Sequence, residues 1–172
     1  MSKTKHPTGL RTLFFTEMWE RMSYYGMRGI LVLFMTASIS NGGLDFNNAS
    51  ASAIYGIYAA AVYLMALPGG WIADNLLGQQ KTILFGGIVI MFGHLSLAVP
   101  NMNFFYLGLI LVVLGTGLLK PNISAIVGGL YENSPSMKES GFTIFYMSIN
   151  IGSILGFFIC GYLGENIGWH YG

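Results

Sequence analysis

Residues 17–26 of the chain read EMWERMSYYG and are followed by Arg28, inside a segment long and apolar enough to cross a lipid bilayer. At about 100° per residue, positions 17, 20, 21, 24 and 28 fall within a sector of roughly 100° on a helix. One stripe therefore carries two acids, two bases and a phenol: Glu17, Glu20, Arg21, Tyr24 and Arg28. Each charge at the centre of a membrane costs at least about 2.5–3.5 kcal/mol. The stripe must therefore face other protein segments or a water-filled cavity rather than lipid.

The composition of the whole chain is that of a helical membrane protein. Hydrophobic residues make up 53% and charged residues only 9%, whereas soluble domains carry about 25% charged residues. The formal net charge of +1 and the lack of a basic cluster in the sequence give no indication of nucleic-acid binding. The sequence contains no zinc-ligand spacing, nucleophile elbow or phosphate-binding loop. We therefore expect no enzyme, no metal and no organic cofactor.

Five apolar segments predict transmembrane helices, at residues 12–38, 49–73, 82–99, 103–129 and 142–164. Residues 1–11 are expected to form a short cytoplasmic tail, and residues 12–172 an N-terminal transmembrane bundle of an all-α protein. Five is an odd number of helices, and the chain stops shortly after the fifth. We therefore expect the bundle to be incomplete and the chain to be an N-terminal fragment of a longer protein.

Basic residues predict the orientation. The N-terminal tail and the loops after the second and fourth segments carry the basic residues Lys3, Lys5, Arg11, Lys81 and Lys138. The other loops carry only acids, so the basic side is expected to be cytoplasmic. The first segment is too long and too charged for a cleavable signal peptide and should act as its own anchor.

Polar groups from four of the predicted helices fall at one depth. At about 1.5 Å per residue, Glu17 and Glu20 lie roughly 8–12 Å from the cytoplasmic end of their helix, and Lys120 roughly 12–14 Å. Tyr63 and Asn150 fall at similar depths. Such convergence is typical of a transport site near the membrane midplane. The alternative for Lys120 is an ion pair that only holds helices together.

Three further residues in these segments have more than one interpretation. Pro68 and Pro121 each remove a backbone donor from a helix, which indicates either a bend or gating hinge, or the ordinary proline of membrane helices. His94 has no acid or second histidine at ligand spacing. We therefore interpret His94 as a packing residue rather than a ligand.

Three motifs resemble those of known transporters. The ExxERxxYYG pattern of residues 17–26 resembles the signature of the proton-dependent oligopeptide transporter family, which belongs to the major facilitator superfamily. Residues 145–153, FYMSINIGS, resemble a second signature of that family. The alternative for Asn150 in this stretch is an interhelical hydrogen bond beside a packing face formed by Gly152 and Gly156.

The loop between the second and third segments resembles the cytoplasmic loop motif of the superfamily, with matching residues Gly70, Asp74, Gly78 and Lys81. A carboxylate at a helix end can hold a basic group or a helix N-terminus in one conformational state. The alternative is a short capped loop.

The resemblance implies a twelve-helix fold of two six-helix bundles around a central cavity, of which this chain supplies the first five helices. Each bundle of that fold consists of two inverted three-helix repeats, so the first and fourth helices occupy equivalent places. Met22 departs from the family pattern, in which many members have phenylalanine.

The resemblance also implies roles for single residues. Proton coupling is assigned to Glu17, Glu20, Arg21 and Lys120, and substrate binding to Arg21, Tyr24, Tyr25, Arg28, Tyr63, Lys120 and Asn150. In the family, Arg21 and Lys120 match positions that face the peptide carboxylate, and Arg28 matches a residue that pairs across the two bundles. Two buried acids oppose three buried bases in this chain, so we expect the acidic partner of Arg28 in the missing half.

The function implied is proton-coupled symport of di- and tripeptides by alternating access, in the plasma or inner membrane of a bacterium. Protons are the coupling ion, and the partners are the peptide, the bilayer and the missing C-terminal half of the transporter. One alternative is a proton-coupled carrier of nitrate or another small anion. An alternative of another class is a non-transporting receptor or assembly subunit, which would not need acids and bases from several helices at one depth.

Overall fold

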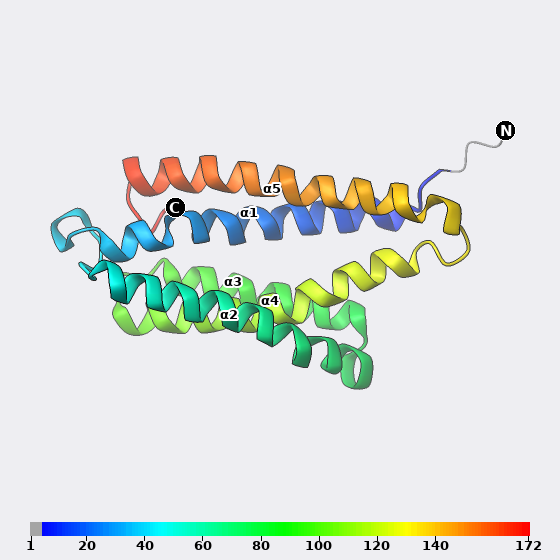
Figure 1. Cartoon of the computed structure of the whole chain (residues 1–172), viewed down its shortest axis with the longest axis horizontal. Coiled ribbons are helices and arrows are strands. Elements are labelled where there is room, and N and C mark those ends of the chain that lie inside the picture. The colour runs from blue at the N-terminus through cyan, green and yellow to red at the C-terminus, as the bar shows by residue number, and fades with distance from the viewer. Residues whose placement is uncertain (1–4) are drawn as a thin grey trace.

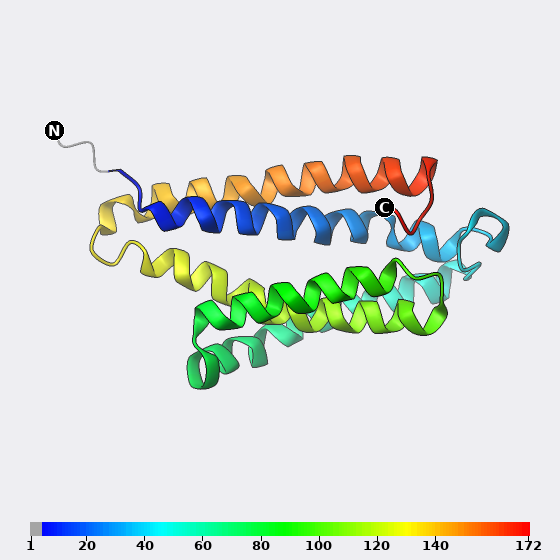
Figure 2. The same ribbon diagram turned by 180° about the vertical axis from the view of Figure 1, so that it is seen from behind.

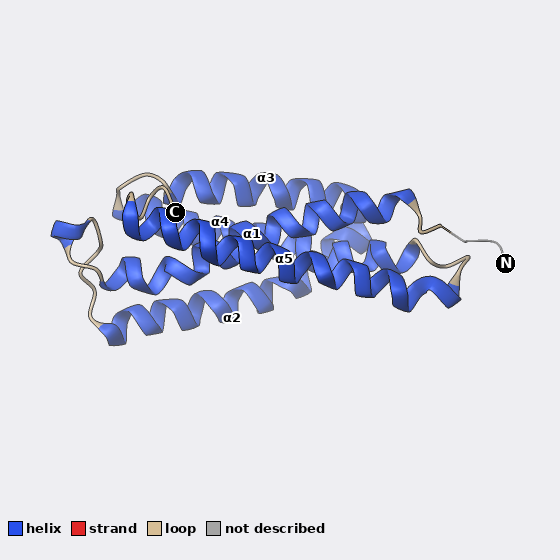
Figure 3. Cartoon of the chain, turned by 90° about the horizontal axis from the view of Figure 1, so that it is seen from above, coloured by secondary structure: helices blue, strands red, loops and turns tan. Residues whose placement is uncertain are grey.

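The structure is a computed structural model that describes residues 5–172, so Lys3 and the rest of residues 1–4 lie outside the described part. Its five long helices are α1 (Thr8–Thr36), α2 (Asn48–Ile72), α3 (Gln79–Leu97), α4 (Met102–Gly129) and α5 (Lys138–Asn166). Short helices are η1 (Ile39–Asn41), the π-helical turn η2 (Ala73–Leu77) and η3 (Pro135–Met137). Within residues 5–172 all regular elements are helices, joined by short loops (Figure 3).

Several helices begin before the apolar segments from which they were expected. α1 starts at Thr8 rather than at residue 12, α3 at Gln79 rather than 82, and α5 at Lys138 rather than 142. Hydropathy marks where a helix enters the hydrocarbon layer, whereas backbone hydrogen bonding continues into the polar residues outside it.

Length and composition alone mark four of the five helices as able to cross a membrane, namely α2 to α5. The 29 residues of α1 are enough to span a bilayer, but its charged stripe makes it less apolar than the other four helices. α1 therefore depends on its neighbours to shield its charges from lipid.

The helices form two layers, with α1 and α5 side by side in one and α2, α3 and α4 in the other (Figures 1 and 2). α4 packs against both α3 and α2. Seen from above, α4 lies beneath α1 and α5, with α3 and α2 to either side (Figure 3).

Small residues allow the α1–α5 seam to close. A side-chain carbon on Gly152 would collide with the carbonyl oxygen of Met18, and one on Gly156 with that of Met22. Backbones at this separation gain van der Waals contacts along their whole length, which is the main source of helix association in membranes. The structure thus shows that Gly152 and Gly156 form a packing face, and this face is turned toward α1.

A second close crossing joins α2 to α4. Gly69 approaches the carbonyl of Gly117, the group that Pro121 leaves without its usual helical donor. The amide of Asn122 donates to Gly69 O (3.2 Å) and to Leu118 O (2.7 Å). Beyond this crossing, α4 swings toward the start of α5 (Figures 1 and 2).

Two apolar clusters join the layers. One gathers side chains of α1, α2 and α4, including Tyr24, Met27, Leu31, Tyr58, Val62 and Phe105. The other lies toward the ends of α1, α4 and α5 that carry Leu10, Val127, Tyr131 and Phe145. Along α1, Glu17, Glu20 and Arg21 lie between Leu10 of the second cluster and Tyr24 of the first.

Candidate functional site

The charged stripe of α1 faces the protein interior. Glu17 and Arg21 are each 2% exposed and Glu20 is 8% exposed. Tyr24 is also buried, and only Arg28, one turn further on, is partly open. The helical spacing of these residues therefore predicts their burial correctly.

Arg21 holds both acids of the stripe. Its Nε lies 2.7 Å from Glu17 Oε1, to which it donates a hydrogen bond, and 2.7 Å from Glu20 Oε2. The N–H at Nε is directed at Glu17, so Glu20 has the ion contact without a hydrogen bond. Glu17 Oε2, both oxygens of Glu20 and Arg21 Nη2 are buried without a hydrogen-bond partner in the described part of the chain.

This buried cluster contains two carboxylates and one guanidinium, so it carries one excess negative charge while both acids are ionised. An uncompensated charge in an apolar interior is unfavourable. Protonation of one carboxylate removes the excess. The expectation of a buried positive excess is wrong, because Lys120 and Arg28 are only partly buried.

Lys120 extends from α4 next to Tyr63 of α2. Its Nζ lies 4.6 Å from the centroid of the Tyr63 ring, a cation–π contact. Among residues 5–172 the ion pairs within 4.0 Å are those of Arg21 alone, so the structure does not show the helix-joining ion pair considered for Lys120. Its ammonium group lacks a carboxylate partner in the described region.

Arg28 is held by aromatic side chains. Its Nε donates a hydrogen bond to the hydroxyl of Tyr55, and its guanidinium carbon lies 5.1 Å from the Tyr55 ring and 6.0 Å from the Tyr24 ring. Arg21 lies over the same Tyr24 ring at 5.5 Å. Tyr24 therefore sits between the two guanidinium groups of the stripe.

Tyr55 was missed by the sequence analysis. It precedes Tyr63 by eight residues, a little over two helical turns, so both side chains share one face of α2. That spacing could have identified Tyr55 once Tyr63 was selected. Tyr58, whose buried hydroxyl has no partner in the described region, lies one turn from Tyr55.

Two other predicted site residues lie away from the bases. Tyr25 packs against Tyr24 (ring centroids 5.3 Å apart) and against Phe157 of α5 (6.2 Å). Asn150 is exposed on α5. It lies two residues, about 200° of helix, from Gly152, whose face is turned to α1. The described helices thus bring Tyr63 to Lys120 but do not bring Asn150 to either base.

The loop motif is exposed in this conformation. Asp74 lies in η2, and Lys81 lies in the first turn of α3. Gly78 joins them with a φ of 78°, which favours glycine. Asp74 makes no ion pair within residues 5–172, and no side chain caps α3. Neither the carboxylate contact expected of Asp74 nor the capped loop is present here.

The described region also lacks any group of three His, Cys, Asp or Glu side chains able to hold a metal ion. The ionisable groups at this level of the bundle are the two acids paired with Arg21 and the two partly open bases Lys120 and Arg28.

The chain is similar to transporters of known families. A sequence model described as "PTR2: POT family" matches residues 80–172. The chain is 50% identical over 168 residues to YclF of Bacillus subtilis, described as an uncharacterized transporter, with 97% of this chain and 34% of that protein covered. It is 49% identical over 169 residues to a di-/tripeptide transporter of Lactococcus lactis, with 96% and 34% covered.

The fold also matches a solved structure. It superposes on a crystal structure of peptide transporter POT in complex with sulfate with a TM-score of 0.93 and 46% identity, covering 99% of this chain and 35% of that one. The chain therefore spans about a third of the length of the proteins it matches.

Proposed function

The chain belongs to the POT family of transporters and has the fold of the major facilitator superfamily, and from this premise we propose that the complete protein is a proton-coupled symporter of di- and tripeptides that works by alternating access. The observation that carries the proposal is the pairing of two buried carboxylates with one guanidinium, beside a lysine without an acid. The first arrangement binds a proton, and the second binds an anion.

Coupling follows from the shared bases. A peptide carboxylate that reaches Arg21 and Lys120 competes with Glu17 and Glu20 for positive charge, which favours protonation of an acid. By linkage, protonation favours peptide binding to the same degree. Each ligand thus promotes binding of the other, as symport requires.

The remaining peptide contacts are assigned by chemistry. Tyr24, Tyr25, Tyr63 and Asn150 offer hydroxyl and amide groups for the peptide bond, and Arg28 offers a further positive charge. In the proposal the acid that pairs with Arg28, and the groups that hold the peptide amine, come from the rest of the transporter.

Orientation is proposed from the ends of the helices. α1, α3 and α5 begin at the same end of the bundle (Figure 2), so Arg11, Lys81 and Lys138, which lie at or near those helix starts, gather there. The positive-inside rule makes this end cytoplasmic. We place the protein in the plasma or inner membrane of a bacterium, with protons as its coupling ion.

The test is uptake of labelled dialanine by the complete transporter in liposomes, with and without an inwardly directed proton gradient. We expect accumulation only with the gradient. Uptake of nitrate without uptake of dialanine would assign the site to small anions instead. Absence of transport of either, with specific binding retained, would support a receptor.

A variant locates the proton site. Glu20→Gln retains the shape of the protonated acid but cannot release a proton, so gradient-driven uptake should fall at least about tenfold. Exchange of labelled for unlabelled dialanine, which needs no net proton movement, should persist. Glu139→Gln, which changes an exposed carboxylate at the start of α5, serves as control. Full gradient-driven accumulation by Glu20→Gln would move the site, with Glu17 the next candidate.

A further inference from the structure

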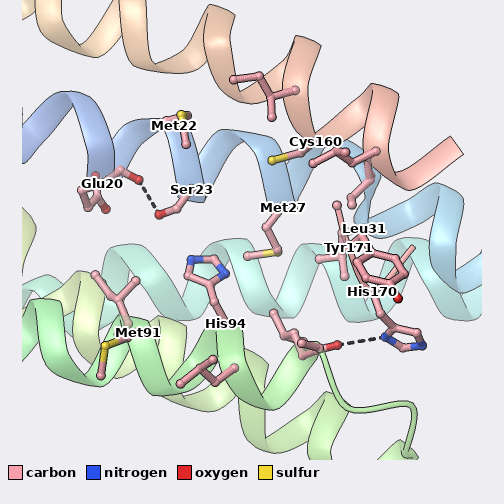
Figure 4. A pocket seen from close by; sticks show the side chains of 18 of the residues that line it. Glu20, Met22, Ser23, Met27, Leu31, Met91, His94, Cys160, His170 and Tyr171 are labelled. Atoms are coloured by element: carbon pink, nitrogen blue, oxygen red, sulfur yellow. Dashed lines mark hydrogen bonds between the residues drawn. The ribbon is translucent and has the colours of Figure 1, made fainter. Parts of the chain in front are cut away.

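Two parts of the bundle differ in how completely this chain builds them. The cavity between α1, α3 and α5, which Glu20 and His94 line (Figure 4), is open where the six-helix bundle still lacks its sixth helix. The crossing of α2 with α4 is instead closed by the chain itself, because Gly69, Gly117 and Asn122 are all buried there. The contacts at this crossing are therefore made wholly by described residues.

Pro121 interrupts α4 directly after Lys120. Its ring nitrogen carries no hydrogen, so the Gly117 carbonyl loses the bond that residue 121 would otherwise donate. A helix without this bond can bend at the break, and the direction of the Lys120 side chain would change with the bend. The position of Lys120 therefore depends on what holds the two sides of the break.

Gly69 of α2 holds both sides. Before the break, a side-chain carbon on Gly69 would collide with the carbonyl oxygen of Gly117, so the two backbones are in contact. After the break, Asn122 Nδ2 donates a hydrogen bond to Gly69 O (3.2 Å). The same nitrogen donates to Leu118 O (2.7 Å), one turn back in α4. Asn122 thus bridges the break within α4 and also ties α4 to α2.

The Asn122 amide is suited to this place. Its nitrogen carries two hydrogens, one for each of the two carbonyls, and the residue is only 3% exposed. A polar side chain buried between membrane helices needs such partners, because hydrocarbon offers it none. Leucine has no donor, and a serine hydroxyl has a single hydrogen on a shorter side chain. Neither could make both bonds.

Lys120 lies between the two attachments, and its aromatic contact lies on the same neighbouring helix. The Lys120 Nζ is 4.6 Å from the centroid of the Tyr63 ring, and Tyr63 precedes Gly69 by six residues in α2. The crossing at Gly69 therefore fixes the height and rotation of the Lys120 turn relative to the helix that carries Tyr63.

We propose, resting on the proposed binding of the peptide carboxylate by Lys120, that Asn122 is a positioning residue for this lysine. By bonding to Gly69 O, the Asn122 amide fixes the turn of α4 that presents the ammonium group to the peptide. Asn122 does not itself touch the peptide, because its amide is buried against the backbones of α2 and α4. Pro121 then marks a bend that is held in place rather than a free hinge.

The test is binding of dialanine and of dialaninamide, which lacks the carboxylate, to the purified complete transporter by isothermal titration calorimetry. The ratio of the two dissociation constants gives the preference for a free carboxylate. Lys120→Met should lower this preference about tenfold, and Asn122→Leu should lower it about threefold or more. The affinity for dialaninamide should be nearly unchanged in Asn122→Leu. The double variant should match Lys120→Met alone, because Asn122 acts only through Lys120.

Asn122→Ser separates the two bonds of the amide. A serine hydroxyl can still donate to Leu118 O in its own helix but is too short to reach Gly69. The preference should therefore fall as in Asn122→Leu, and this variant still tests the proposal if Asn122→Leu does not fold. Asn103→Leu, at an exposed position of the same helix, is the matched control and should keep the full preference.

An unchanged preference in Asn122→Leu and Asn122→Ser, or an equal loss of affinity for both ligands, would show that Asn122 only holds the helices together and would overturn the proposal. A further fall in preference in the double variant would overturn it as well. If Lys120→Met keeps the preference for dialanine, or the unmodified transporter has none, the proposed carboxylate site fails, and the positioning role of Asn122 fails with it.

Discussion

The charges of α1 and the charge of α4 are held in opposite ways. On α1, Arg21 is buried and bound to two acids of its own helix, at a seam where its Cβ packs against Gly152 of α5. On α4, Lys120 is partly open beside the exposed ring of Tyr63 and lacks an acid in the described region. In the superfamily fold these two helices occupy equivalent places in inverted repeats. In the proposed function this difference leaves the acids of α1 to bind protons and the lysine of α4 to bind the peptide carboxylate.

Replacement of Arg21 is expected to have the largest effect on the stability of α1. Arg21→Met leaves two buried carboxylates without their base, and such a loss costs about 3–5 kcal/mol. We expect the largest fall in thermal unfolding midpoint in detergent for this variant, together with loss of uptake. Arg11→Met, at an exposed position in the first turn of α1, is the control. An unchanged midpoint would mean that the acids are already protonated in the folded protein.

The second-largest loss of stability is expected at the seam between α1 and α5. Gly152→Leu places a side chain against the backbone of Met18, so α1 and α5 must separate, at a cost of about 1–3 kcal/mol or more. Gly161→Leu is the matched control, because a side chain at this position on the same helix meets no atom within 4 Å. Equal unfolding midpoints for the two variants would show that the α1–α5 seam is not tightly packed.

A smaller effect is expected at the aromatic clamp of Arg28. Tyr55→Phe keeps the ring under the guanidinium but removes the hydroxyl that accepts from Arg28 Nε. The loss should be about 1 kcal/mol, because Arg28 remains partly open to solvent. Thermal unfolding measures it, with Tyr146→Phe at an exposed position as control. A higher unfolding midpoint for Tyr55→Phe would show that this hydrogen bond does not stabilise the protein.

Lys120→Met should change stability least. The variant removes a cation–π contact with an exposed ring, which is worth about 0.5–1 kcal/mol, and leaves no carboxylate within 4.0 Å unpaired in the described helices. Uptake should nevertheless fall, because the peptide carboxylate loses a base. Lys138→Met, at an exposed residue, is the control. A stability loss as large as that of Arg21→Met would show that Lys120 binds a buried acid. α4 would then hold its charge in the same way as α1.

Much of this site is determined locally and could be read from the sequence. Positions 17 and 21 are four apart on a helix, so the contact of Arg21 with Glu17 needs no other helix. The contact of Arg21 with the adjacent Glu20 does not follow from this spacing and is given by the structure. The charges themselves demand shielding from lipid, so burial of the stripe followed from its spacing. The glycine face of α5 was likewise evident from the spacing of Gly152 and Gly156.

Contacts between helices were decided by the tertiary structure. Depth along a helix placed Lys120 at the level of the acids, but depth contains no information on rotation or on the distance between helix axes. Packing turned Lys120 toward Tyr63, turned Arg28 toward Tyr55 and left Asn150 exposed. Helix periodicity specifies which side chains share a face, whereas the partner of each face depends on how all the helices fit together.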